Sequence, residues 1–216
     1  MSNRLYPLWP MALLAVLAVL GLAVQALDLV DARALLDWAR GLTAHWWFVL
    51  LLVLLQVVLF TFALPGSAVL WLVAPLFAPA AATAILTAGG CIGALAAYAF
   101  ARRLTGASIT RLQGTRGFRL MQREGGFLLQ CALRLAPGFP HSAINYAAGT
   151  LRLPLAPFMA STAIGFGLKT WLYSQAIDAA LAAGRPADLL GTQTLWPLLA
   201  AVVIALAARA WAGRRR

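Results

Sequence analysis

Long runs of apolar residues, separated by short polar connections, dominate this sequence. About 20 consecutive apolar residues suffice for a helix to cross a bilayer, and several runs reach or exceed that length. The pattern predicts apolar helical segments at 8–27, 45–79, 80–101, 127–150, 155–177 and 194–212. The expected fold class is therefore all-α, in the form of a polytopic α-helical membrane protein.

Pro-Gly interrupts two of these segments near their centres. The interruptions are Leu64-Pro65-Gly66-Ser67 in the first, and Pro137-Gly138-Phe139-Pro140 between Arg134 and His141 in the second. Proline removes a backbone donor and glycine tolerates positive φ, so each break leaves backbone groups unpaired. At membrane depth such groups occur only where protein or a water-filled cavity covers them. Each break therefore indicates a candidate site.

Composition agrees with the membrane interpretation. The chain of 216 residues is 62% hydrophobic and 11% charged, well outside the range of soluble domains. Its formal charge of +11 comes from basic residues that flank apolar segments, which favours a topology signal over nucleic-acid binding, so no nucleic-acid partner is expected. Cys91 and Cys131 lie inside apolar segments without a ligand-like spacing to His, which indicates packed thiols and no metal site.

The arginines predict the orientation of the chain. They cluster in the connection before 127–150 and after the last apolar segment, at Arg102, Arg103, Arg111, Arg116, Arg119 and Arg123, and at Arg209, Arg214, Arg215 and Arg216. Both clusters should be cytoplasmic, whereas the connections 28–40 and 178–193 each sum to −1 and should lie outside. Segment 8–27 is interpreted as an uncleaved signal anchor, with a cleaved signal peptide as the alternative. Both termini are then cytoplasmic.

This orientation leaves residues 45–101 one net crossing. Segment 45–79 must then turn back at Pro65-Gly66 as a re-entrant hairpin, and 80–101 makes the crossing. Equally, 127–150 enters from the inside as a second hairpin before a crossing at 155–177. Hairpin and span thus occur twice in opposite orientations, an inverted repeat whose broken elements meet near the midplane. The alternative is that residues 45–64 span the membrane alone.

Arg134 is the candidate binding residue with the clearest chemistry. A guanidinium three residues before Pro137 cannot lose its charge and must meet an anion, freed carbonyls or water. Its shape suits a phosphate, and the alternative is a structural arginine that caps carbonyls at the break. His141 and Asn145 follow as an i, i+4 pair able to face the same cavity. No acidic residue falls within the apolar part of a predicted span or hairpin, and no hydrolase, metalloprotease or P-loop motif is present, so an enzyme is not expected.

Several motifs resemble one known family in their order along the chain. They are Phe62-x-Leu64-Pro65-Gly66, Gly89-Gly90-x-x-Gly93 leading to Tyr98-x-Phe100-Ala101-Arg102, and Arg134-Leu135-x-Pro137-x-Phe139-Pro140 followed by Asn145-Tyr146-x-x-Gly149. Over about residues 40 to 180 the sequence is similar to the SNARE-associated Golgi protein family, or VTT domain, whose bacterial cousins are the DedA proteins. Ser67 stands where the DedA branch has Glu, and Pro140-His141 stand where it has a second Arg. The Golgi-type branch therefore fits better, and proton-driven transport is not expected.

The resemblance implies a membrane protein that moves lipids between leaflets, either phospholipid or polyprenyl phosphate. The expected binding residues are Arg134, Asn145, His141 and Ser67, and the residues expected to shape the hairpins are Pro65, Gly66, Pro137, Gly138 and Pro140. Expected partners are lipids with anionic head groups, without a cofactor, and a homo-oligomer is left open. A non-transporting scaffold and a small-solute transporter are the alternatives.

The predicted organisation has three parts. Residues 1–40 hold the anchor and a surface helix, 41–180 the membrane domain, and 181–216 a last span with a basic tail. The implied location is a bacterial inner (plasma) membrane.

Overall fold

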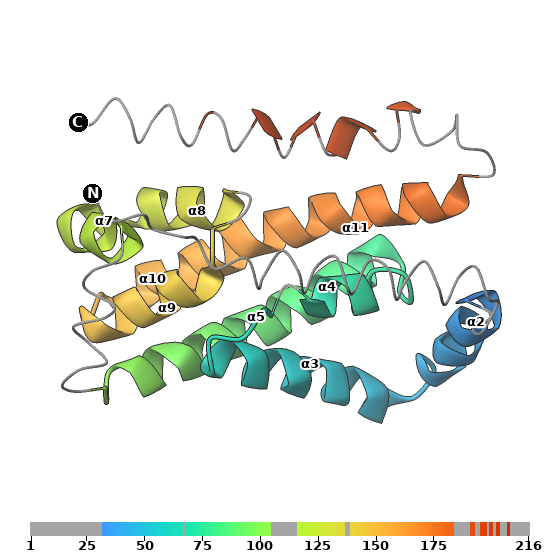
Figure 1. Ribbon diagram of the computed structural model, residues 1–216, viewed down its shortest axis with the longest axis horizontal. Coiled ribbons are helices and arrows are strands. Elements are labelled where there is room, and N and C mark those ends of the chain that lie inside the picture. Colours follow the sequence, from blue (N-terminus) through green and yellow to red (C-terminus); the bar gives the residue numbers. More distant parts are fainter. Residues whose placement is uncertain are drawn as a thin grey trace, which may run out of the picture. The chain divides into compact units, whose positions relative to one another are not determined.

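The computed structural model describes residues 32–66, 68–104, 116–136 and 139–183, with a few positions between 191 and 207 (Figure 1). Within these residues the chain is helical and forms no strand, which confirms the predicted all-α class. The chain divides into two units after Leu42. The predicted anchor 8–27 and most of the predicted last span 194–212 lie outside the described residues.

The described part of the first unit is the helix α2 (Ala32–Leu42). Leu35 and Trp38 are exposed on it, and Arg40 Nη1 lies 3.4 Å from Asp37 Oδ1 in an exposed i, i+3 pair. The helix overlaps the short surface helix that the sequence predicts before residue 41.

The second unit begins with α3 (Trp46–Thr61), a 16-residue apolar helix. It ends in a Schellman cap, in which Leu64 N–H donates to Leu59 carbonyl (2.8 Å) and Ala63 N–H to Phe60 carbonyl (3.3 Å). Ala63 has φ of 58°, in the left-handed region that this cap requires. Pro65 follows and prevents the helix from continuing, so the first predicted break is a helix terminus. The short helix α4 (Ala68–Val73) comes next and contacts both α3 and α5 (Pro79–Ala101).

Helix α5 is the element on which the second unit is assembled. It has 23 residues and is the one described helix long and apolar enough by itself to cross a bilayer. Its glycines admit α3 closely, since a Cβ at Gly93 would lie 2.9 Å from Phe60 Cβ and 3.2 Å from Val57 Cα. The predicted crossing 80–101 therefore coincides with α5.

The remaining described helices are α7 (Arg116–Glu124), α8 (Phe127–Leu135), α9 (His141–Thr150), α10 (Leu155–Ser161), the π-helix η1 (Thr162–Phe166) and α11 (Gly167–Ala182). Most of them pack on α5, and α7 and α8 pack on α9. Tyr98 links α5 to the turn after α9, because its hydroxyl donates to Leu153 carbonyl (2.8 Å) and its ring packs on Phe158. Gly149 of α9 lies against Tyr98 carbonyl, where a Cβ would collide.

The end of α9 repeats the cap of α3. Leu153 N–H donates to Ala148 carbonyl (3.0 Å), Arg152 N–H to Gly149 carbonyl (3.1 Å), and Arg152 has φ of 52°. Pro154 then follows as Pro65 does after α3. The sequences at the two ends, Thr61-Phe-Ala-Leu-Pro65 and Thr150-Leu-Arg-Leu-Pro154, share the same positions for Thr, Leu and Pro.

The predicted crossing 155–177 lies in a continuous helical run formed by α10, η1 and α11. The predicted hairpins 45–79 and 127–150 correspond to the pairs α3–α4 and α8–α9 in chain order. Their re-entrant insertion and their relation as an inverted repeat stay predictions.

Candidate functional site

Arg134 lies in the last turn of α8 and is fully buried. Its Nη2 donates to Asn145 Oδ1 at 3.2 Å, and its guanidinium carbon lies 5.2 Å from the centroid of the Phe158 ring. Among the described residues, Nε and Nη1 have no hydrogen-bond partner. The side chain is thus held at one nitrogen and one face, while two further donors remain for another acceptor.

The π-helix η1 allows the chain to approach Arg134 closely. A Cβ at Gly165 would lie 3.1 Å from Arg134 Cβ and 3.3 Å from Cys131 Cα, so a larger residue would force the two segments slightly apart. The thiols of Cys91 and Cys131 are free. π-helical turns occur often at functional sites because they shift side chains out of α-helical register.

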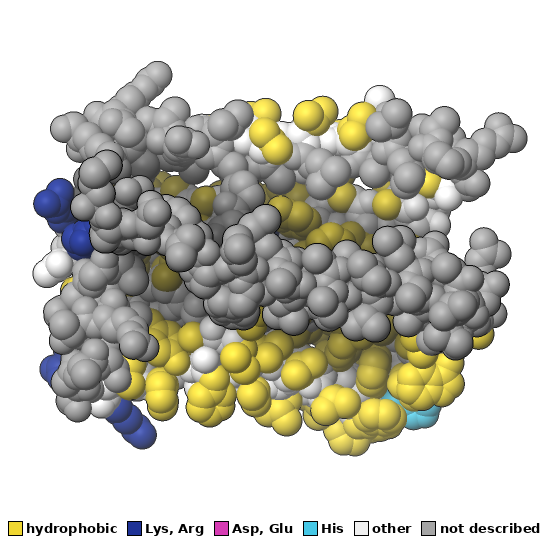
Figure 2. All heavy atoms as spheres, viewed as in Figure 1, with side chains coloured by type: hydrophobic (Ala, Val, Ile, Leu, Met, Phe, Trp, Pro, Cys, Tyr) yellow, Lys and Arg dark blue, Asp and Glu magenta, His cyan; other side chains and the backbone are white. Residues whose placement is uncertain are grey.

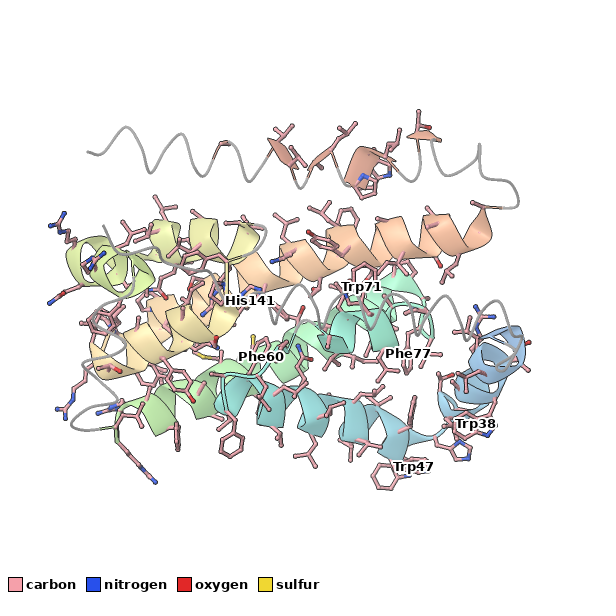
Figure 3. The ribbon with its side chains drawn as sticks, viewed as in Figure 1. Trp38, Trp47, Phe60, Trp71, Phe77 and His141 are labelled. Carbon is pink, nitrogen blue, oxygen red and sulfur yellow. The ribbon has the colours of Figure 1, made fainter. Side chains whose placement is uncertain are left out.

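His141 begins α9 and is buried between two aromatic rings. Its ring stacks on Phe60 of α3 (6.1 Å between centroids) and meets Phe166 of η1 edge to face (5.0 Å). Figure 3 labels Phe60 and His141, which come from the ends of elements 80 residues apart in the chain. Lys169 Nζ of α11 lies 3.5 Å from His141 Nε2. An ammonium only donates, so a hydrogen bond here makes Nε2 the acceptor and leaves the imidazole proton on Nδ1.

The structure brings three of the predicted binding residues into the same part of the second unit. Arg134 and Asn145 are hydrogen-bonded, and His141 lies one turn before Asn145 on the same buried face of α9. Gly66 is buried against the Phe60 ring, where a Cβ would collide, while Pro65 and Pro140 are exposed beside the helix ends that they terminate or begin. Ser67, Pro137 and Gly138 lie outside the described residues.

The sequence analysis does not single out two residues that the structure places nearby. Lys169, the one lysine of the chain, is partly buried within the predicted crossing 155–177. Gln56 is fully buried in α3, and neither atom of its amide has a hydrogen-bond partner among the described residues. Lys169 and Gln56 each interrupt a long apolar stretch of the sequence. A polar side chain inside such a stretch is the signal by which sequence reasoning could have found them.

The charge of this region is positive in the part of the chain that the structure describes. Arg134 and Lys169 contribute two cations, and the carboxylates whose side chains the structure describes, Asp37 and Asp178, are both exposed. A buried guanidinium with unpartnered donors can bind a carboxylate or a phosphate in bidentate fashion. Anion binding is the chemistry that this arrangement favours.

Comparison with protein families gives a match, which covers the region just described. The VTT domain family matches residues 64–179, more than half of the chain, in a range that includes both Pro-Gly breaks and the cluster around Arg134. No curated protein and no solved structure matches the chain. The match confirms the resemblance seen in the sequence, and membrane association is a property of the family. The chain therefore belongs to the VTT domain family and is a membrane protein.

Proposed function

We propose that this protein moves lipids with an anionic, phosphate-bearing head group between the two leaflets of a bilayer. Arg134 binds the phosphate, Asn145 orients the guanidinium, and His141 lines the path. The observation that carries the proposal is the fully buried Arg134, which keeps two donors unpartnered among the described residues. A permanent charge in an apolar interior is costly and is typical of a substrate path.

The contact between the two broken segments supports the proposal. The Phe60 ring stacks on His141, and the Tyr146 hydroxyl donates to Thr61 carbonyl, so the end of α3 packs against α9. In Figure 1, α3 and α8 approach the middle of the second unit from opposite sides of the view. In transporters built from inverted repeats, the substrate site usually lies near the midplane, where the two broken elements meet.

Lys169 strengthens the case for an anion over a neutral solute. Among the described residues its polar contact is with His141, which carries no charge when the lysine donates to it. A phosphate passing Arg134 would therefore meet a second cation on α11. A closed site for a small solute does not need a lateral opening, whereas a lipid path does, so lateral access distinguishes the two alternatives.

The test is leaflet exchange of labelled phosphatidylglycerol in liposomes that contain the purified protein. Arg134→Ala should lower the exchange rate to that of protein-free liposomes, because the phosphate loses its counter-charge. Arg134→Lys should retain part of the rate, because it keeps the charge but not the bidentate geometry. The matched control is Arg103→Ala, which removes an exposed arginine after α5 and should exchange lipid at the parental rate.

Two outcomes oppose the proposal. If the parental protein gives no exchange with any labelled phospholipid or polyprenyl phosphate, the scaffold alternative holds. If Arg134→Ala inserts normally and exchanges lipid at the parental rate, Arg134 is structural.

A further inference from the structure

Gln56 is a buried side chain whose hydrogen bonds the fold does not supply. Its exposed fraction is 0%, and both Nε2 and Oε1 are unpartnered among the described residues. A buried amide without partners is destabilising, so such groups usually bind water, ligand or protein. Leucine has nearly the same volume and would fit the apolar sequence around position 56 without this cost.

Helix α5 is shaped to leave room for the Gln56 amide. A Cβ at Gly89 would lie 2.6 Å from Gln56 Oε1, so only glycine at this position allows the amide to lie where it does. The adjacent Gly90 receives the Phe166 ring in the same way, with a Cβ 2.5 Å from its Cε1. Two consecutive glycines therefore admit the amide and an aromatic ring that packs on His141.

Another buried glutamine of the chain shows what a structural role looks like. Gln130 in α8 is 1% exposed, its Nε2 donates to Gly125 carbonyl (2.7 Å), and its Oε1 accepts from Ser161 Oγ (3.2 Å). Its amide joins α8 to the preceding turn and to α10. Gln56 makes no equivalent connection among the described residues, although it is equally buried.

Gln56 lies close to the site around Arg134. It precedes Phe60 by one turn of α3, and Phe60 stacks on His141. It also packs on Gly89 of α5, next to Gly90, on which the Phe166 ring lies. Two elements, α3 and η1, therefore approach α5 at residues 89 and 90.

We propose that Gln56 is a second head-group contact and binds a hydroxyl group of the lipid. Its Nε2 needs an acceptor and its Oε1 needs a donor, and a hydroxyl satisfies both. An ionised phosphodiester only accepts hydrogen bonds, so it would leave Oε1 unpartnered. This inference rests on the proposed function, and it names the class of substrate as anionic lipids whose head group carries a hydroxyl, such as glycerol.

Two labelled lipids of equal charge test the assignment. Phosphatidylglycerol and phosphatidylethanol each carry one negative phosphodiester, but only the glycerol head group has hydroxyls. The parental protein in liposomes should exchange phosphatidylglycerol about tenfold faster than phosphatidylethanol, the effect of one or two hydrogen bonds. Gln56→Leu should remove this difference and exchange phosphatidylethanol at the parental rate.

Stability measurements separate this role from a structural one. Gln56→Leu should raise the resistance of the detergent-solubilised protein to denaturation while it removes lipid selectivity, because the substitution eliminates an unpartnered amide. The matched control, Gln130→Leu, should lower that resistance, because Ser161 Oγ loses an acceptor and α8 loses its bond to Gly125. A purely structural Gln56 would behave like Gln130.

The results distinguish failure of this inference from failure of the proposed function. If the parental protein exchanges both lipids at one rate, or Gln56→Leu keeps the parental selectivity, Gln56 does not contact the head group, although lipid movement stands. If Gln56→Leu is more stable but leaves both exchange rates unchanged, its partner is water only and the inference is overturned. If the parental protein exchanges neither lipid, the proposed function itself fails.

Discussion

The buried polar side chains of the second unit fall into two groups, those with hydrogen-bond partners inside the fold and those with unpartnered atoms. Gln130 and Ser161 find partners within the fold and connect α8 to α10, and the Thr162 hydroxyl donates to Phe158 carbonyl within its own helical run. Arg134 and Gln56, in contrast, keep unpartnered atoms among the described residues. The first group stabilises the structure, and under the proposed function the second reduces stability in exchange for binding capacity. This contrast assigns candidate roles without any comparison to relatives.

Glycine at position 149 should be essential for folding. Gly149→Ala should lower the free energy of unfolding by about 1–3 kcal/mol, because its Cβ would collide with Tyr98 carbonyl and lie 2.8 Å from Ala101 Cβ. The control is Gly41→Ala in α2, where nothing lies within 4 Å and alanine favours the helix. Unfolding in detergent measures both, and equal effects would show that α9 does not pack on α5 as described.

At the scale of elements, helix termination shapes the chain more than the Pro-Gly pairs alone suggest. Both α3 and α9 end in a Schellman cap with a non-glycine residue at positive φ, and proline follows two residues later. The π-helix η1 then displaces the next helical run by part of a turn, which places Phe166 against Gly90 and His141. These local features position the site residues.

The cap of α3 predicts that an Ala→Gly substitution changes stability in opposite directions at two positions. Ala63→Gly should stabilise the protein by about 1 kcal/mol, because glycine adopts positive φ without the steric cost that alanine bears. Ala84→Gly, on an exposed position inside α5, should destabilise it by about 1 kcal/mol, because glycine disfavours the helix interior.

Equilibrium unfolding in a denaturing detergent measures both alanine substitutions. A destabilising Ala63→Gly would contradict the cap geometry at the first break.

At the scale of the whole molecule, charge indicates how the protein lies in the membrane. Exposed arginines occur at the end of α5, in α7 and after α9, and Figure 2 shows Lys and Arg side chains gathered at the left end of the view. Hydrophobic side chains cover the visible face along α3. Positive charge marks the cytoplasmic side of a membrane protein.

Side-specific labelling checks this orientation. In a variant with Cys91→Ala and Cys131→Ala, a cysteine introduced as Arg103→Cys should be protected from a membrane-impermeant maleimide added outside intact cells. A cysteine introduced as Asp178→Cys, at an exposed position near the end of α11, should react with it. Reaction at 103 from outside, with protection at 178, would invert the topology and contradict the positive-inside assignment.

The sequence by itself determined the helical class, the long apolar helix α5 and the two breaks, and it singled out Arg134 as the candidate binding residue. These follow from local chemistry: apolar runs favour helices in a bilayer, proline and glycine end them, and an arginine in an apolar run needs a partner. The family resemblance also depended only on residues in order.

Only the tertiary structure decided which polar residues share the site. Gln56, His141 and Lys169 are far apart in the chain, and apolar stretches give little sign of which face of a helix is buried when lipid and protein are equally apolar. The π-helix cannot be read from periodicity because it depends on how η1 packs against Gly90 and Arg134. Gly89 and Gly90 belong to one of the motifs that carry the resemblance, but what they admit, an amide and an aromatic ring, depends on the neighbouring helices that fold against α5.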